Sequence, residues 1–125
     1  MTFTRRLVKK WTIHYHTLKK IFMIRCACVN DKNRPNDIPT TKWVKRGQVY
    51  TIQFAIVVLP QRELGLQLEE IELDESCAPY EYFLANRFAF LNDDLYKLQE
   101  FIRDCARVNM SIKELMKQSN ILNHA

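Results

Sequence analysis

The chain has 125 residues, of which 47% are hydrophobic and 26% are charged. This length accommodates one small domain with a single modest core, and it excludes two domains of ordinary size. The formal net charge is +5, from 19 Lys and Arg against 14 Asp and Glu. A basic balance is typical of proteins that bind nucleic acids or acidic membranes, so the position of the charges along the chain decides its meaning.

Residues 1–22 form a basic leader that carries six Lys and Arg and no acidic residue. Residues 23–125 therefore hold 13 basic and 14 acidic residues, a net charge of −1. At about 100° per residue, the apolar residues of the leader fall on one side of a helix. They are Leu7, Trp11, Tyr15, Leu18 and Phe22. A strand remains an alternative, because Trp11, Ile13 and Tyr15 alternate with polar residues.

The first predicted strand begins at Met23. We hypothesise that translation starts there and that residues 1–22 come from an upstream start; a genuine leader is the alternative. Lys9 and Lys10 interrupt the apolar stretch that a secretory signal needs. No run of about 18 apolar residues predicts a transmembrane helix. We therefore expect a cytoplasmic protein, and the four cysteines are expected to remain free thiols in a reducing compartment.

Residues 23–90 are predicted to form antiparallel β-structure, because β-branched and aromatic residues alternate with turn-forming segments. The predicted strands are 23–29, 48–59, 66–73 and 87–90. Gly47 is expected to adopt a positive φ in the turn before the second strand. Residues 60–65 are predicted to connect the second and third strands, and a bulge near Glu69 and Glu70 would align the apolar residues of the third strand. Residues 80–85 are predicted as a short helical turn.

Residues 91–125 are predicted to form two helices. Asn92 is the expected N-cap of the first, and Ser111 and Glu114 match the capping box of the second. The first helix carries one apolar stripe: Leu95, Leu98, Phe101, Ile102, Cys105 and Val108. The helices are expected either to cap an open end of the β-structure or to protrude as a hairpin. In the second case Leu98, Phe101, Ile102 and Cys105 would form a face for a partner protein or a homodimer.

A basic pair, a glycine and a tyrosine lead into the second strand, as Lys45-Arg46-Gly47-Gln48-Val49-Tyr50-Thr51-Ile52. This segment resembles small SH3-like β-barrels. Further motifs over residues 23–90 are similar to uncharacterised small proteins of gut bacteria and their phages: Cys26 and Cys28, Asn36-Asp37-Ile38-Pro39, Lys42-Trp43-Val44-Lys45, Cys77-Ala78-Pro79-Tyr80-Glu81-Tyr82 and Asn86-Arg87-Phe88. The resemblance implies a mainly β, α+β fold, with a small SH3-like antiparallel barrel or curved sheet over residues 23–90, and a phage or mobile-element setting. It carries no activity and no site residues.

Catalysis and metal binding are the weakest function classes. Cys26 and Cys28 lie two apart on a strand, and with Cys77 and Cys105 they could supply four thiolates, but structural zinc sites draw paired ligands from turns with a wider spacing. No nucleophile arrangement accompanies His14 and His16. The acidic run of residues 69–81 is expected to lie on a solvated face and in turns. We therefore expect no enzyme activity, no cofactor and no metal.

The candidate binding residues are a basic and aromatic cluster: Lys42, Trp43, Lys45, Arg46 and Tyr50. Arg62 and Arg87 are further candidates for its surroundings. Such a cluster suits phosphates and stacked bases, but rings of this kind are also typical of a core rim. Residues 23–65 carry a net charge of +4 and residues 66–94 carry −7. This two-signed body favours a protein-interaction module, with RNA or DNA binding as the alternative and a membrane partner not expected.

Overall fold

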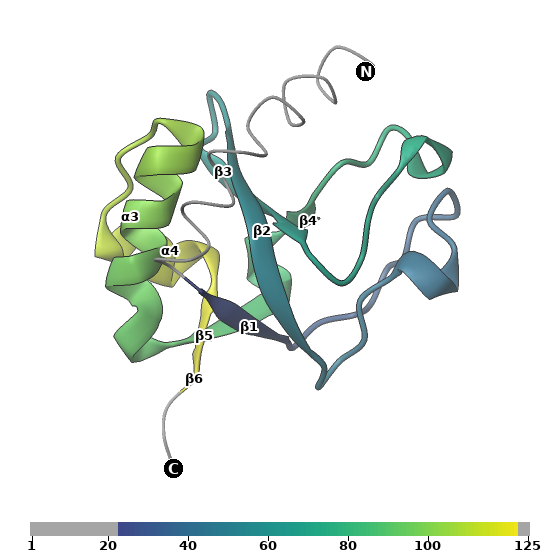
Figure 1. The fold of residues 1–125 in the computed structure, drawn as a ribbon, viewed down its shortest axis with the longest axis horizontal. Coiled ribbons are helices and arrows are strands. Elements are labelled where there is room, and N and C mark those ends of the chain that lie inside the picture. Colours follow the sequence, from purple (N-terminus) through teal and green to yellow (C-terminus); the bar gives the residue numbers. More distant parts are fainter. Residues whose placement is uncertain (1–22, 123–125) are drawn as a thin grey trace.

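A computed structural model describes residues 23–122, which form a mixed α+β fold (Figure 1). The predictions for residues 1–22 lie outside the described residues. One sheet has the strand order β4-β3-β2-β1-β5-β6. Its strands are β1 (Arg25–Cys28), β2 (Val49–Val58), β3 (Glu63–Leu68), β4 (Phe83–Leu84), β5 (Phe88–Leu91) and β6 (Asn120–Leu122). All neighbours are antiparallel except β5 and β6, which are parallel.

The long strand β2 belongs to both halves of the sheet. Its first residues pair with β1, and the residues from Ile52 onward pair with β3, with a register shift between Ile52 and Phe54. Both carboxylate oxygens of Glu70 accept from the Thr51 backbone N–H, at 2.9 and 3.0 Å, just before this irregularity. The sheet is not closed, because the two edge strands β4 and β6 do not pair with each other. The sequence predicts either a barrel or a curved sheet, and a closed barrel is not observed.

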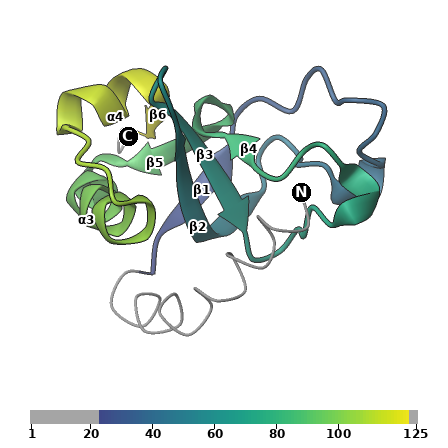
Figure 2. The ribbon, with the colours of Figure 1, turned by 90° about the horizontal axis from the view of Figure 1, so that it is seen from above.

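The helices lie on one side of β2, and the long connections 29–48 and 69–82 lie on the other (Figures 1 and 2). The helix α3 (Leu95–Ala106) follows the 3-10 turn η4 (Asn92–Asp94), and α4 (Ile112–Gln118) follows an extended segment. Short 3-10 helices η1 (Thr40–Lys42), η2 (Glu75–Cys77) and η3 (Ala85–Arg87) lie in the connections.

The apolar stripe of α3 is buried in the core of the chain itself. Leu98, Phe101 and Ile102 are at most 1% exposed, and Cys105 is 6% exposed. They belong to one core cluster with strand residues such as Ala55. The predicted partner or dimer face of Leu98, Phe101, Ile102 and Cys105 is thus covered by the sheet, and the protruding hairpin is wrong. Burying this stripe removes its apolar surface from water without a second molecule.

The third strand begins earlier than predicted. Glu63 pairs with Val58, so the connection has only four residues, and Gly65 lies inside β3 rather than in the turn. Leu64, Leu66 and Leu68 alternate along β3 and are all buried. The bulge expected at Glu69 and Glu70 lies instead on the partner strand, between Ile52 and Phe54. β3 ends at Leu68, so Glu69 and Glu70 lie outside the ladder and the predicted bulge in this strand is wrong.

Several local predictions are confirmed and others are wrong. Gly47 has φ +89°, and Ser111 and Glu114 form the capping box of α4. Residues 80–85 contain β4 instead of a helical turn. Asn92 makes no capping bond, because it begins η4 rather than the α-helix. β6, which follows α4 directly, was not predicted; its pairing with β5 depends on contacts far apart in the sequence.

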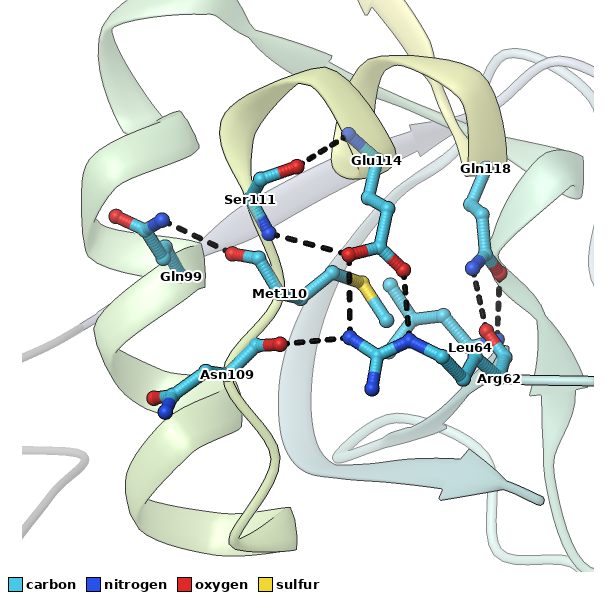
Figure 3. Close-up of polar contacts among 8 residues, drawn as sticks. All are labelled: Arg62, Leu64, Gln99, Asn109, Met110, Ser111, Glu114 and Gln118. Carbon is cyan, nitrogen blue, oxygen red and sulfur yellow. Dashed lines mark hydrogen bonds and ion pairs between the residues drawn. The ribbon is translucent and has the colours of Figure 1, made fainter. Parts of the chain in front are cut away.

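A polar cluster ties the β2–β3 connection to α4 (Figure 3). The Arg62 guanidinium binds the Glu114 carboxylate through Nε at 2.8 Å and Nη2 at 3.1 Å, and Nη2 also donates to the Asn109 carbonyl at 2.6 Å. The Gln118 side chain accepts from the Leu64 backbone N–H at 2.7 Å and donates to the Arg62 carbonyl. These bonds hold α4, and with it the start of β6, beside the edge of β3.

Candidate interaction surface

Trp43 anchors the connection between β1 and β2. Its indole Nε1–H donates to the Asp31 carbonyl at 2.6 Å. Its ring lies 5.7 Å from the Phe83 ring, at an interplanar angle of 56°. The indole is half-buried, and its contacts stabilise the loop. Its N–H already donates to Asp31, and part of its ring already packs near Phe83, so neither is free to bind a ligand.

Arg87 completes this anchor from the other side. Its guanidinium lies 4.7 Å from the centre of the Trp43 ring, within the range of a cation–π contact. Its Nη1 donates to the carbonyls of Asn30 and Lys32, at 3.2 and 2.7 Å. The expectation that Arg87 lies near the cluster is therefore confirmed. Arg62, by contrast, lies in the polar cluster with Glu114 and not beside Trp43.

Tyr50 is a core residue rather than an exposed ring. It is 6% exposed, and its ring meets the Phe88 ring edge-on at 6.3 Å. The Tyr50 hydroxyl accepts from the Lys45 backbone N–H at 2.9 Å. Burial raises the pKa of Tyr50 above its usual value, because the phenolate would lose its hydration. Tyr50 thus orients the turn that carries Lys45 and offers no stacking surface.

Lys42 bridges the two long connections through an ion pair with Asp74. Asp74 also caps η2, accepting from the Ser76 backbone N–H at 3.0 Å. The hydrogen bond from Lys42 is the main cause that lowers the pKa of Asp74 to about 2, and the bond from Ser76 adds to it. The same bond raises the pKa of Lys42. Lys42 therefore acts first as a structural cross-link in the described chain.

This ion pair predicts a dependence of stability on acidity. Because the pKa of Asp74 is lower in the folded chain than its usual 3.8, the contribution of its carboxylate is fully present above that value and is lost as the pH falls toward 2. We expect Asp74→Asn to lower the free energy of unfolding at neutral pH. The gap, which is the difference in free energy of unfolding between the native chain and the variant, should shrink as the pH falls from about 5 to about 2. Urea titrations at several pH values measure this gap.

Asp37→Asn provides the matched control, because Asp37 is an exposed carboxylate in the same connection as Lys42. The control is expected to leave the gap near zero at every pH. A gap for Asp74→Asn that is constant across the acid range would contradict the role given to the carboxylate charge.

The two remaining cations of the cluster, Lys45 and Arg46, are exposed. The Arg46 backbone N–H donates to the Asp31 carboxylate at 3.1 Å, which positions the residue and leaves its guanidinium outside that bond. Arg46 borders an open polar hollow of about 400 Å³. The hollow is lined by Val29, Asn30, Asp31, Lys32, Arg46, Asn86 and Asn120. We call Lys45 together with the residues of this hollow the loop surface.

The structure thus separates the predicted binding residues into two groups. Lys45 and Arg46 are on the surface, whereas Lys42, Trp43 and Tyr50 hold the loop in place. The hollow also brings in residues that the sequence did not predict as binding residues, above all Asn30, Asn86 and Asn120. Asn30 lies two residues after β1, Asn86 is the middle residue of η3, and Asn120 begins β6. Only the tertiary arrangement shows that these three segments meet.

The cysteines and the acidic run have structural surroundings. Cys26, Cys28, Cys77 and Cys105 are free and buried. Burial raises the pKa of Cys26 strongly and that of Cys105 to about 12, so these thiols stay protonated near neutral pH. Within residues 23–122 no group of three or more His, Cys, Asp or Glu side chains is arranged to hold a metal ion. Of the acidic run, Glu70 caps a backbone N–H of β2 and Asp74 pairs with Lys42.

The helices of the described region are too short or too polar to span a bilayer. Comparisons of the chain with protein-family models, with curated proteins and with solved structures found no match. The loop surface is therefore interpreted from its own geometry.

Proposed function

We propose that the protein is a non-enzymatic protein-interaction module and that the loop surface is its contact. One observation carries this proposal. Lys45 and Arg46 are exposed beside a polar hollow, whereas the rings of Trp43 and Tyr50 pack against other side chains of the fold. Amide, carboxylate and basic side chains together match the mixed donors and acceptors of a polypeptide. The sequence resemblance supports an accessory role in the cytoplasm of a bacterium or a phage-infected host.

An SH3-like arrangement of the sheet is likewise a proposal. The sheet is mostly antiparallel, and β2 is shared between a half with β1 and a half with β3, as in a sheet that curls upon itself. Closure would need the edges β4 and β6 to pair. Instead, the Asn120 side chain donates to the Asn86 carbonyl at 2.9 Å, so the β6 edge meets η3 through a side chain rather than through a strand ladder.

Binding of RNA or DNA is the alternative function. Proteins that bind single strands combine basic grooves with exposed rings on which bases stack. Here the cations Lys32, Lys45 and Arg46 are available, but Tyr50 is buried and Trp43 is covered by Arg87. What remains is attraction to phosphates, which the acidic residues 66–94 oppose.

A charge reversal at Lys45 and Arg46 tests the loop surface. We expect Lys45→Glu with Arg46→Glu to weaken binding of a captured partner protein by about tenfold or more, because the two new carboxylates would repel an acidic contact that Lys45 and Arg46 attract. Capture from native lysate with and without nuclease identifies the partner, and titration of the purified partner measures the change. Lys113→Glu with Lys117→Glu on α4 is the control, with little change expected.

Nucleic-acid binding would give a different pattern in the same experiment. The captured material would disappear after nuclease treatment, and the affinity for a mixed-sequence single-stranded RNA would fall steeply with salt. If the partner protein binds the charge-reversed variant with the same affinity as the native chain, the loop surface is not its contact.

A further inference from the structure

The strand β6 forms one edge of the sheet. It pairs with β5 in parallel, Asn120 with Ala89 and Leu122 with Leu91, and within residues 23–122 no strand lies on its other side. An edge strand presents backbone N–H and C=O groups that can pair with another extended chain. β6 has only three residues, which limits the length of any added ladder, but it contains neither Pro nor a charged residue, two devices that block such pairing.

The polar hollow lies at the start of this edge. Asn120 is both the first residue of β6 and part of the lining. Its Nδ2 donates to the carbonyls of Asn86 and Phe88, at 2.9 and 3.2 Å, which fixes the side chain at the junction. Lys32 and Arg46 line the same hollow and are exposed, and among the described residues their charged groups make no ion pair. The nearest acidic lining residue is Asp31, which already accepts from the Arg46 N–H.

An apolar site lies further along the same edge. Leu122 and Leu91 are register partners on neighbouring strands and are 38% and 37% exposed. Leu122 is two residues from Asn120, so both side chains project from the same face of β6. The edge therefore combines a cationic hollow and an apolar pair, separated by the repeat of a β-strand, about 7 Å.

We propose that the β6 edge binds an extended segment of a partner protein by strand addition. An acidic side chain of the segment enters the hollow beside Lys32 and Arg46, and an apolar side chain two positions away covers Leu122 and Leu91. Asp31 is one acidic residue against Lys32 and Arg46 in the lining, so the carboxylate of the segment balances the remaining positive charge, and the added strand pairs the open edge. This inference rests on the proposed function and names the class of partner.

The probe is a displayed library of random peptides of about a dozen residues, selected on the full chain. We expect the enriched peptides to place Asp or Glu two positions from Val, Ile, Leu or an aromatic residue. Synthetic versions of an enriched peptide then carry a single N-methyl group at each backbone nitrogen in turn. Methylation at alternate positions, where the N–H faces β6, should weaken binding about tenfold or more, and the intervening positions should change it far less.

A variant of the protein tests the hollow independently. Arg46→Ala should weaken the acidic peptide about tenfold while leaving the thermal unfolding midpoint close to that of the native chain. Arg103→Ala, an exposed arginine on α3, is the matched control. The same peptide with its acidic residue changed to the amide should bind the native chain and Arg46→Ala equally.

Three results would overturn the inference: enrichment without an acidic residue, N-methyl effects without alternation, or equal binding to Arg46→Ala. If a purified partner protein binds through Lys45 and Arg46 while showing none of these signatures, the proposed function stands and strand addition at β6 is wrong. If neither peptides nor proteins bind and nuclease-sensitive RNA does, the proposed function itself is wrong.

Discussion

Replacing Phe101 by Ala is expected to lower the free energy of unfolding by about 3–5 kcal/mol, because the ring is fully buried and its removal leaves a cavity in the core. Phe101 lies in the middle of the α3 stripe, between Leu98 and Cys105, which are buried as well. The loss is therefore expected in the isolated chain at any protein concentration. Urea or thermal denaturation measures it.

The matched control is Tyr96→Ala on the same helix. Tyr96 is 69% exposed, so its replacement is expected to change stability by no more than about 0.5 kcal/mol. The pair distinguishes a core stripe from a partner face. A Phe101→Ala protein that unfolds like the native chain but loses a partner, or that changes from dimer to monomer, would contradict the burial of α3.

Replacing Gly65 by Ala is expected to destabilise the chain by about 1–3 kcal/mol. A Cβ at this position would lie 2.1 Å from Cδ1 and 2.7 Å from Cγ of the Tyr82 ring. Cγ is close to the backbone, so the ring cannot avoid the new methyl group by a small swing of its far end. Either β3 or the segment before β4 has to move, and Gly65 pairs with Leu84 in that ladder.

The Tyr82→Ala background identifies the cause. The three atoms nearest to the new Cβ all belong to the Tyr82 ring, so without the ring we expect Gly65→Ala to be neutral or stabilising by up to about 1 kcal/mol. A double-mutant cycle in urea measures the coupling. An equal cost in both backgrounds would show that the glycine is required by the backbone rather than by the ring.

Local patterns predicted most of the elements. The alternating apolar residues identified β1, β2 and β5, and the capping box identified the start of α4. Each of these signals depends on neighbours within a few residues, which is why sequence alone reveals it. Gly47 was predicted for the same reason, because a turn that needs positive φ is a property of two or three residues.

The errors concern pairing. Residues 120–122 become a strand because β5 offers an open side, and nothing in Asn120-Ile121-Leu122 specifies a parallel partner some thirty residues earlier. The start of β3 depends on its register with Val58, and the bulge could lie on either strand of the pair. The strands were recognised, but a barrel and a curved sheet both remained open, because closure depends on how the edge strands meet.

The candidate site shows the same division. Lys45 and Arg46 were predicted from composition, and they are exposed. Trp43 and Tyr50 were predicted as binding residues together with Lys45 and Arg46. Whether a ring is exposed for binding or packed within the fold depends on the residues that contact it. For Trp43 this is Arg87, and for Tyr50 it is Phe88. The sequence did not predict the asparagines of the hollow as binding residues, because three segments distant in the chain bring them together.

The sequence by itself determined how the net charge of +5 is distributed along the chain. Residues 1–22 form a basic leader, and the nearly neutral body has a basic part over residues 23–65 and an acidic part over residues 66–94. The sequence also determined where apolar faces would be, because strand and helix periodicities are local. The tertiary structure alone decided what covers those faces. The α3 stripe packs on the sheet within the same chain, and two exposed cations, Lys32 and Arg46, line the hollow beside the β6 edge. Burial and juxtaposition depend on contacts between residues distant in the chain, which no short window of sequence contains.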